Sequence, residues 1–167
     1  WALEAANLET TLRRCTICMS CWFQSRVTLE QCDITALSWF YGEHIEGPLP
    51  SGSVVRQCLL RLGRGNSEIA VSCNGRINGL PAPAAVADRP ALSDLLFEEN
   101  EIDGRFEIRR ARGVRLVNNR FAPERGQVTL GECREVLLTG NRLGNEALPA
   151  DRIRILDQAM RDATRSQ

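Results

Sequence analysis

The chain of 167 residues has no lysine, one histidine and few aromatic residues, and its formal net charge is zero. Because 21 arginines balance 21 acidic residues, the strong positive field expected of a nucleic-acid-binding protein is missing. We attribute the lack of lysine to genomic composition bias or to solvated arginine faces. No apolar run approaches the ~20 residues of a membrane span, and no signal peptide opens the chain. We therefore expect neither a nucleic-acid partner nor a membrane span.

The length suits a single domain that can bury a continuous core. With three Trp, one Tyr and five Phe, the composition favours a core of stacked aliphatic side chains. Because the chain begins at Trp1 without methionine, we expect a trimmed or excised piece of a longer protein. A signal sequence could have been lost with the missing part, so the localisation stays open.

One pattern of apolar residues and asparagine occurs three times in the C-terminal half. Two apolar residues stand two positions apart, an asparagine follows three positions later, and another apolar residue comes two positions after it. The copies are Leu95-x-Phe97-x-x-Asn100-x-Ile102, Val114-x-Leu116-x-x-Asn119-x-Phe121 and Val136-x-Leu138-x-x-Asn141-x-Leu143. Such phrases describe short strands with a corner, and a period of about 20 residues is typical of a solenoid.

Related copies precede these three. A second series, eight residues ahead of the first, consists of Phe106-x-Ile108-x-x-Ala111 and Val128-x-Leu130-x-x-Cys133. Toward the N-terminus the copies are Thr10-x-Leu12-x-x-Cys15-x-Ile17, Val27-x-Leu29-x-x-Cys32-x-Ile34, Ser53-x-Val55-x-x-Cys58-x-Leu60 and Ile69-x-Val71-x-x-Asn74. The predicted column is Cys15, Cys32, Cys58, Asn74, Asn100, Asn119 and Asn141. Since two spacings are short for a full coil, the alternative is that some early copies lie on another face. The copies indicate five to seven coils.

These phrases resemble the repeats of right-handed parallel β-helix proteins of the pectate-lyase-like superfold, a broad group of carbohydrate-binding proteins and sugar hydrolases. The resemblance covers residues from about 10 to 145. It implies an all-β fold, a right-handed parallel β-helix solenoid over residues 1–150, in which the four asparagines of the column form an internal amide ladder. The group includes polysaccharide lyases, hydrolases, epimerases and non-catalytic parts of phage tails. Since the matching residues build the coil, they indicate the fold better than the function.

Residues 151–167 differ in pattern from the repeats. Asp151 can cap a segment in which Ile155, Leu156, Ala159, Met160 and Ala163 recur at three- and four-residue spacing, which predicts a helix from about 152 to 164. An amphipathic helix laid over an open solenoid end would cover its exposed edges and core. Two alternatives are a last strand over Arg152–Ile155 before a shorter helix, and a helix that binds a partner.

Seven cysteines cannot all pair internally, and Cys15, Cys18 and Cys21 form a C-x2-C-x2-C run. A bacterial ferredoxin pattern needs a fourth cysteine where Ser25 stands. On an extended strand Cys15 and Cys21 face one way and Cys18 the other, so the three thiols do not converge on a metal. We interpret the column cysteines as small core residues and expect no metal and no cofactor.

Two sets of residues are candidates for ligand binding. Trp22 and Trp39 each follow a column cysteine by seven residues, so Trp22-Phe23 and Trp39-Phe40-Tyr41 are expected to stack on adjacent coils, either as a platform for sugar rings or as core packing. After the column asparagines stand Glu101, Arg120 and Arg142, where Glu101 beside Arg120 is favourable. Arg120 beside Arg142 is repulsive unless a carboxylate or ligand lies between them. The predicted ligand-binding residues are Trp22, Trp39, Tyr41, Glu101, Arg120 and Arg142.

An enzyme on this fold would need clustered acids with a cationic neighbour. The acids Glu98, Glu99, Glu101 and Asp103 could serve with Arg109, Arg110, Arg112, Arg115 and Arg120 to bind an acidic sugar, with Glu99 or Glu101 moving a proton. The other interpretation is a pair of solvated, mutually neutralising faces. His44, the one histidine, stands near no recognisable nucleophile.

No catalytic residue is predicted. We expect a non-catalytic structural or carbohydrate-binding module of a larger surface or phage-tail-like assembly, with a glycan or protein partner. The alternatives are a polysaccharide lyase, hydrolase or epimerase acting on acidic glycans, and an oligomerisation scaffold.

Overall fold

The computed structural model describes residues 2–5, 9–39, 51–62, 69–73, 76–77, 80–81 and 92–156. Within these ranges the chain consists of short β-strands, and the one helical segment is the 3-10 helix η1 (Ala150–Arg152). The all-β expectation is therefore confirmed at the level of the fold class. In this part of the chain no helix is long and apolar enough to cross a membrane.

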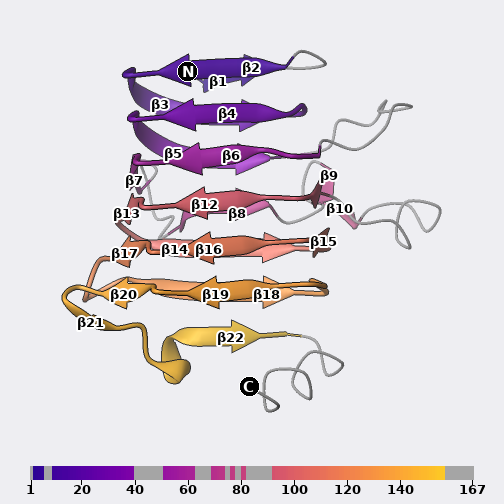
Figure 1. Ribbon diagram of the computed structural model, residues 1–167. Coiled ribbons are helices and arrows are strands. Elements are labelled where there is room, and N and C mark those ends of the chain that lie inside the picture. The colour runs from indigo at the N-terminus through magenta and orange to yellow at the C-terminus, as the bar shows by residue number, and fades with distance from the viewer. Residues whose placement is uncertain are drawn as a thin grey trace.

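Six parallel strands form one sheet. They are β2 (Thr10–Arg13), β4 (Val27–Glu30), β6 (Val54–Arg56), β12 (Leu96–Glu98), β16 (Arg115–Val117) and β19 (Leu137–Thr139). Each strand pairs with the next one in chain order, so the sheet grows in one direction from the N-terminal to the C-terminal end of the molecule (Figure 1). We use the word layer for one strand of this sheet together with the strands that follow it in the chain, up to the next strand of the same sheet.

The second sheet has twelve strands and divides into two runs at β5 (Asp33–Trp39). One run continues through β7 (Leu59–Arg61), β13 (Glu101–Ile102), β17 (Arg120–Phe121), β20 (Arg142–Leu143) and β21 (Glu146–Ala147). The other continues through β8 (Ile69–Cys73), β14 (Arg105–Arg109), β18 (Gln127–Gly131) and β22 (Ile153–Ile155). On the N-terminal side, β3 (Thr16–Phe23) pairs with β5, and β1 (Ala2–Ala5) pairs with β3.

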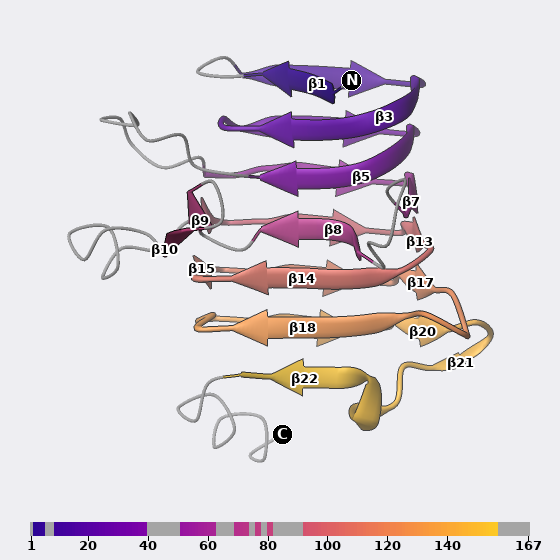
Figure 2. The same ribbon diagram turned by 180° about the vertical axis from the view of Figure 1, so that it is seen from behind.

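The long strand β5 serves both runs because it bends. Its residues 33–35 pair with β7 and its residues 37–39 pair with β8, while Ala36 between them has a φ of 49°. In later layers two separate strands replace this single bent strand. The strands β3, β5, β8, β14, β18 and β22 lie one below another on the side of the molecule opposite the six-stranded sheet (Figure 2).

Four further short strands lie outside these two runs and the six-stranded sheet. The strands β11 (Leu92–Ser93) and β15 (Ala111–Arg112) are parallel, whereas β9 (Arg76–Ile77) and β10 (Leu80–Pro81) are antiparallel. At the C-terminal end β21 pairs antiparallel with β20. The chain therefore folds back over the edge of β20.

The strand register confirms the alignment of six copies of the sequence pattern. The second apolar residue of each copy lies opposite that of the next, in the order Leu12, Leu29, Val55, Phe97, Leu116 and Leu138. The copy that contains Val71 does not join this series, because Val71 lies opposite Leu37 and Phe106 in the other sheet. For this copy, the alternative that it occupies another face is confirmed. Asn74 itself lies outside the described residues.

The core lies between the sheets and is built from side chains stacked in register. In the middle layers Leu29, Val55, Phe97 and Leu116 are buried, whereas Leu12 and Leu138 in the outer layers are only partly buried. Four rings join the layers, with centroid separations of 6.4 Å for Phe23 and Trp39, 5.9 Å for Trp39 and Phe97, and 4.8 Å for Phe97 and Phe106. Burial of apolar area contributes roughly 25 cal/mol per Å², so each layer stabilises its neighbours.

A corner residue with positive φ follows each strand of the six-stranded sheet. These residues are Arg14, Gln31, Gln57, Glu99, Asn118 and Gly140, with φ between 53 and 64°. Side chains with a Cβ adopt this conformation at a cost of about 1–2 kcal/mol. Hydrogen bonds link four of these side chains across layers, Arg14 to Gln31 at 3.1 Å, Gln31 to Gln57 at 3.2 Å and Gln57 to Glu99 at 3.0 Å. The sequence pattern did not reveal this position, because the residue types differ.

The predicted helix from about 152 to 164 is wrong where the structure describes it. Ala150–Arg152 is a 3-10 turn, and Ile153–Ile155 is the strand β22, parallel to β18. Ile153 and Ile155 lie opposite Val128 and Leu130, so the two-residue apolar spacing of the repeat prevails over helical spacing. The alternative of a last strand is confirmed for these three residues. The remainder of the predicted helix, 157–164, lies outside the described residues.

Candidate functional site

Three buried asparagines are hydrogen-bonded to one another where the chain turns from the six-stranded sheet into the second sheet. The Asn100 Nδ2 donates to the Asn119 Oδ1 at 2.9 Å, and the Asn119 Nδ2 donates to the Asn141 Oδ1 at 3.0 Å. Each of these Oδ1 atoms also accepts the backbone N–H of the preceding asparagine, at 3.0 Å in both cases. Each of the three Nδ2 atoms also donates to a carbonyl of the preceding layer, in Val55, Phe97 and Leu116. Both amide hydrogens of Asn100 and of Asn119 are thus hydrogen-bonded, as expected of buried polar groups.

Two cysteines extend this arrangement toward the N-terminus. The Cys58 backbone N–H donates to the Asn100 Oδ1 at 2.9 Å, and the Cys32 N–H lies 3.4 Å from the Cys58 Sγ. Cys58 therefore bonds directly to Asn100, while Asn74, predicted between them in the column, lies outside the described residues. We name the set Cys15, Cys32, Cys58, Asn100, Asn119 and Asn141 the corner row.

The charged residues that follow the corner row lie side by side on the second sheet. Glu101 is opposite Arg120, and Arg120 is opposite Arg142. The Arg120 guanidinium lies 2.6 Å from the Glu101 carboxylate, which confirms the predicted lateral pair. Arg142 makes no ion pair with the residues that the structure describes.

A second ion pair lies on the same sheet, between Arg61 and Asp33. The hydrogen bonds from Arg61 hold the pKa of the Asp33 carboxyl below its ordinary value.

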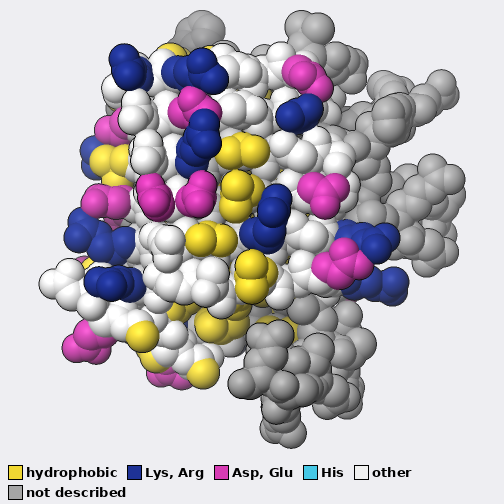
Figure 3. All heavy atoms as spheres, in the orientation of Figure 1, with side chains coloured by type: hydrophobic (Ala, Val, Ile, Leu, Met, Phe, Trp, Pro, Cys, Tyr) yellow, Lys and Arg dark blue, Asp and Glu magenta, His cyan; other side chains and the backbone are white. Residues whose placement is uncertain are grey.

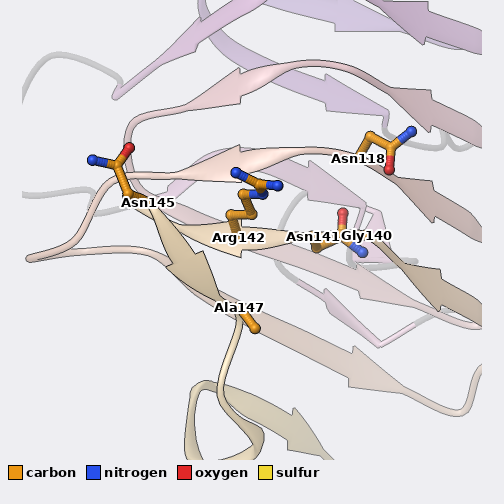
Figure 4. Close-up of a pocket in the computed structure, with 6 residues that line it drawn as sticks. All are labelled: Asn118, Gly140, Asn141, Arg142, Asn145 and Ala147. Carbon is orange, nitrogen blue, oxygen red and sulfur yellow. The ribbon is translucent and has the colours of Figure 1, made fainter.

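Two shallow hollows flank these side chains. The smaller, of about 320 Å³, is lined by residues that include Glu101, Asp103 and Arg120. The larger, of about 590 Å³, lies at the C-terminal end of the corner row and is lined by Asn118, Gly140, Asn141, Arg142, Asn145 and Ala147. In Figure 4 the Arg142 side chain lies between Asn145 on one side and Asn141 and Asn118 on the other. Sequence reasoning identified Arg142 but missed Asn118 and Asn145.

The acidic and basic groups of the enzyme hypothesis do not form one site. Glu99 accepts a hydrogen bond from Gln57, and Glu101 pairs with Arg120. The other arginines of the hypothesis lie on or beside different strands, and three of them pair with acids outside that group, Arg109 with Glu107, Arg110 with Glu132 and Arg112 with Glu135. Of the five arginines, only Arg120 has an ion pair with the predicted acids among the described contacts.

The two predicted tryptophans lie in different environments. Trp22 is 42% exposed, whereas Trp39 is 2% exposed and packs against Phe23. Trp22 lies opposite Ser38, because register irregularities between Ile17 and Cys21 shift β3 relative to β5. Trp22 and Trp39 therefore do not stack on each other, and the predicted contact between the two aromatic pairs is made instead by Phe23 with Trp39. Burial removes Trp39 from the candidate binding surface. Tyr41, together with His44, lies outside the described residues.

Burial divides the six described cysteines into three classes. Cys18 is exposed, Cys15 is half-buried, and Cys21, Cys32, Cys58 and Cys133 are buried. None of these six is in a disulfide. Burial raises the pKa of Cys21 to about 11, and also that of Cys58 to about 11. The described residues contain no group of three side chains suited to a metal ion.

We expect maleimide to label Cys18 fast and the buried cysteines slowly, because the reactive species is the exposed thiolate. The Cys18→Ser variant loses this fast phase, and the matched Cys58→Ser variant keeps it. Rapid labelling of Cys58 in the native protein would contradict the assignment.

Folding raises the pKa of the Cys21 and Cys58 thiols from 9.0 to about 11. The contribution of these two thiols to stability is therefore present below pH 9 and is lost as the pH rises from 9.0 to about 11. Urea unfolding across this pH range measures the loss.

Comparison of the chain with models of protein families, with curated proteins and with solved structures gives no match. Its function is consequently inferred from its own hydrogen bonds, ion pairs and surface hollows.

Proposed function

We propose that the chain is a right-handed parallel β-helix with an internal asparagine ladder, and that it is a non-catalytic, carbohydrate-binding structural module of a larger surface or phage-tail-like assembly. The parallel register of six layers supports the fold. The observation that carries the structural role is the corner row, in which Asn100, Asn119 and Asn141 bond layer to layer. In such a repeat each layer buries the apolar face of the next.

Polar side chains at repeated outward positions support the same role. On the six-stranded sheet Glu30 lies between Arg13 and Arg56 and pairs with both. The hydrogen bond from Arg56 and the charge of nearby Arg13 hold the pKa of Glu30 below its ordinary value. Figure 3 shows side chains of both charge signs mixed with hydrophobic ones over this face. Exposed pairs contribute about 0–1 kcal/mol each, so such columns favour register more than overall stability.

Three features support carbohydrate as the ligand. Trp22 presents an exposed ring, which suits stacking on the apolar face of a sugar. The hollow beside Arg120 combines a guanidinium with carboxylates, and the hollow beside Arg142 combines a guanidinium with amides. Side chains of these kinds are the hydrogen-bonding partners that sugar hydroxyls and carboxylates require.

The enzyme alternative has less support. A general acid or base must reach the proton that it transfers, and Glu101 is instead held by Arg120 at 2.6 Å. The scaffold alternative would use the same stacked layers with no ligand at the hollows.

We expect weak glycan binding and no turnover of polygalacturonate, alginate or neutral glycans. A glycan array, run beside a lyase assay and a reducing-sugar assay, measures both. Binding should decrease in Trp22→Ala or in Arg142→Gln, whereas Trp39→Phe is the control for an aromatic change inside the core. Robust turnover that disappears in Glu101→Gln or Arg120→Ala establishes the enzyme instead. If the protein shows no binding and no turnover, the oligomerisation scaffold is favoured instead.

A further inference from the structure

The corner row repeats one hydrogen-bonding unit until it reaches Asn141. The backbone N–H of each row residue from Cys32 to Asn119 donates to the side chain of the next row residue, as Cys58 does to Asn100, and Asn100 to Asn119. The side-chain amides of Asn100 and Asn119 likewise each donate a second hydrogen bond to the next Oδ1. An asparagine of the row therefore directs two donors toward the following layer.

At Asn141 these two donors have no acceptor among the described residues. The Asn141 Nδ2 donates to the Leu116 carbonyl at 2.8 Å, which accounts for one of its two hydrogens. The Asn141 carbonyl accepts the N–H of Leu148 at 2.9 Å, but its own N–H donates to none of the described groups. Asn141 is only 9% exposed. Because a buried donor without a hydrogen-bond partner destabilises the fold, an acceptor at this position is favourable.

The larger hollow adjoins Asn141, the residue whose donors lack an acceptor. Asn141 lines it together with Arg142, Asn118 and Asn145. Arg142 adds a positive charge that no described carboxylate neutralises, in contrast to Arg120, which Glu101 neutralises in the preceding layer. Gly140, also in the lining, has a φ of 64°, and a Cβ there would come within 2.0 Å of the Asn118 Oδ1. Glycine therefore leaves room for the Asn118 side chain at this wall of the hollow.

We propose that this hollow is a binding site for a carboxylate, and specifically for the carboxylate of an acidic sugar. One carboxylate oxygen takes the place of the missing Oδ1 and accepts from the Asn141 N–H and Nδ2. The charge of the carboxylate pairs with the Arg142 guanidinium. Donors together with a cation select an anion, because a neutral carbonyl satisfies the donors and leaves the guanidinium without a charged partner.

The remainder of the hollow favours a sugar over a simple anion. At about 590 Å³ it is much larger than a carboxylate group. The side-chain amides of Asn118 and Asn145 each carry donors and an acceptor, which match the hydroxyls of a sugar ring. This inference rests on the proposed carbohydrate-binding function and names its ligand class.

The test is a titration of the isotope-labelled protein with D-galacturonate, followed by NMR. We expect the backbone amide resonance of Asn141 to move on titration. The dissociation constant should rise about tenfold or more in Arg142→Gln, since loss of a charge-assisted contact has this effect. The neutral methyl ester of the same sugar should not bind. Arg115→Gln, an exposed arginine of β16 outside the hollow, is the matched control and should bind as the unmodified protein does.

The outcomes separate this inference from the proposed function. If galacturonate or its ester moves resonances near Trp22 and not that of Asn141, carbohydrate binding stands and the end-of-row site is refuted. If acetate binds at Asn141 as tightly as galacturonate, the carboxylate site stands and its sugar specificity is refuted. Equal binding of acid and ester, or equal affinity of Arg142→Gln and Arg115→Gln, overturns the proposal. Unchanged thermal unfolding of Arg142→Gln excludes misfolding as the cause of a loss.

Discussion

Replacing Trp39 by alanine should destabilise the protein by about 3–5 kcal/mol, the range for truncation of a buried large aromatic residue. Trp39 is 2% exposed and joins Phe23 on one side to Phe97 on the other. Its removal therefore opens a cavity between layers and breaks the chain of rings that ends at Phe106. Urea unfolding monitored by circular dichroism measures the free energy.

Two variants define the specificity of this effect. Trp22→Ala should destabilise the protein less than Trp39→Ala, because Trp22 is 42% exposed whereas Trp39 is 2% exposed. Trp39→Phe should destabilise less than Trp39→Ala, since it keeps an aromatic ring and removes an indole Nε1 that has no hydrogen-bond partner among the described residues. Equal losses for Trp22→Ala and Trp39→Ala would show that the register of β3 and β5 is not as described.

Replacing Asn119 by leucine should destabilise the protein by on the order of 3 kcal/mol, because several buried polar groups lose their partners at once. The Asn100 N–H and Nδ2 lose their acceptor, and the Phe97 carbonyl and the Asn141 Oδ1 lose a donor. Leucine has the same number and branching of side-chain heavy atoms as asparagine, and its bulkier methyl groups add a packing cost to the lost hydrogen bonds.

Asn145→Leu is the matched control for Asn119→Leu, since it makes the same chemical change at a residue that lines a surface hollow. Its effect on stability should stay within about 0.5 kcal/mol. Chemical denaturation of both variants under the same conditions gives the comparison. If Asn119→Leu is as stable as the unmodified protein, the corner row is not a source of stability and the proposed ladder loses its basis.

The sequence pattern predicted the repeated layers well because the apolar spacing that creates a strand face also sets its register. Leu12, Leu29, Val55, Phe97, Leu116 and Leu138 were aligned by spacing alone, and they lie opposite one another in the sheet. The Glu101–Arg120 pair followed from the same alignment, since residues at equal offsets from the row occupy equal positions on neighbouring strands.

Local irregularities account for the failures. The equal spacing of Trp22 and Trp39 from their cysteines predicted a stack, but the irregular register in β3 and the bend at Ala36 place Trp22 opposite Ser38. Spacing alone also could not separate the copy that contains Val71 from the others, because it has the same apolar spacing while Val71 belongs to another strand run.

The residues of the larger hollow were missed for a different reason. Asn118 occupies the positive-φ corner, where other layers have Arg14, Gln31, Gln57 and Glu99. A position defined by backbone conformation carries no common side chain, so no repeat in the letters marks it. Asn145 follows the last copy of the pattern and lies in the turn between β20 and β21. Neither residue could be placed beside Arg142 without the fold.

The hydrogen bonds to side-chain acceptors along the corner row all run in one direction, from the N-terminal layer to the C-terminal one. This set of hydrogen bonds therefore has one polarity, and its last donors, without an acceptor among the described residues, are those of Asn141. Two copies that met through identical ends at Asn141 would place donor against donor and Arg142 against Arg142. A symmetric dimer through this end is consequently disfavoured, and whatever binds there must be chemically unlike the end that it meets.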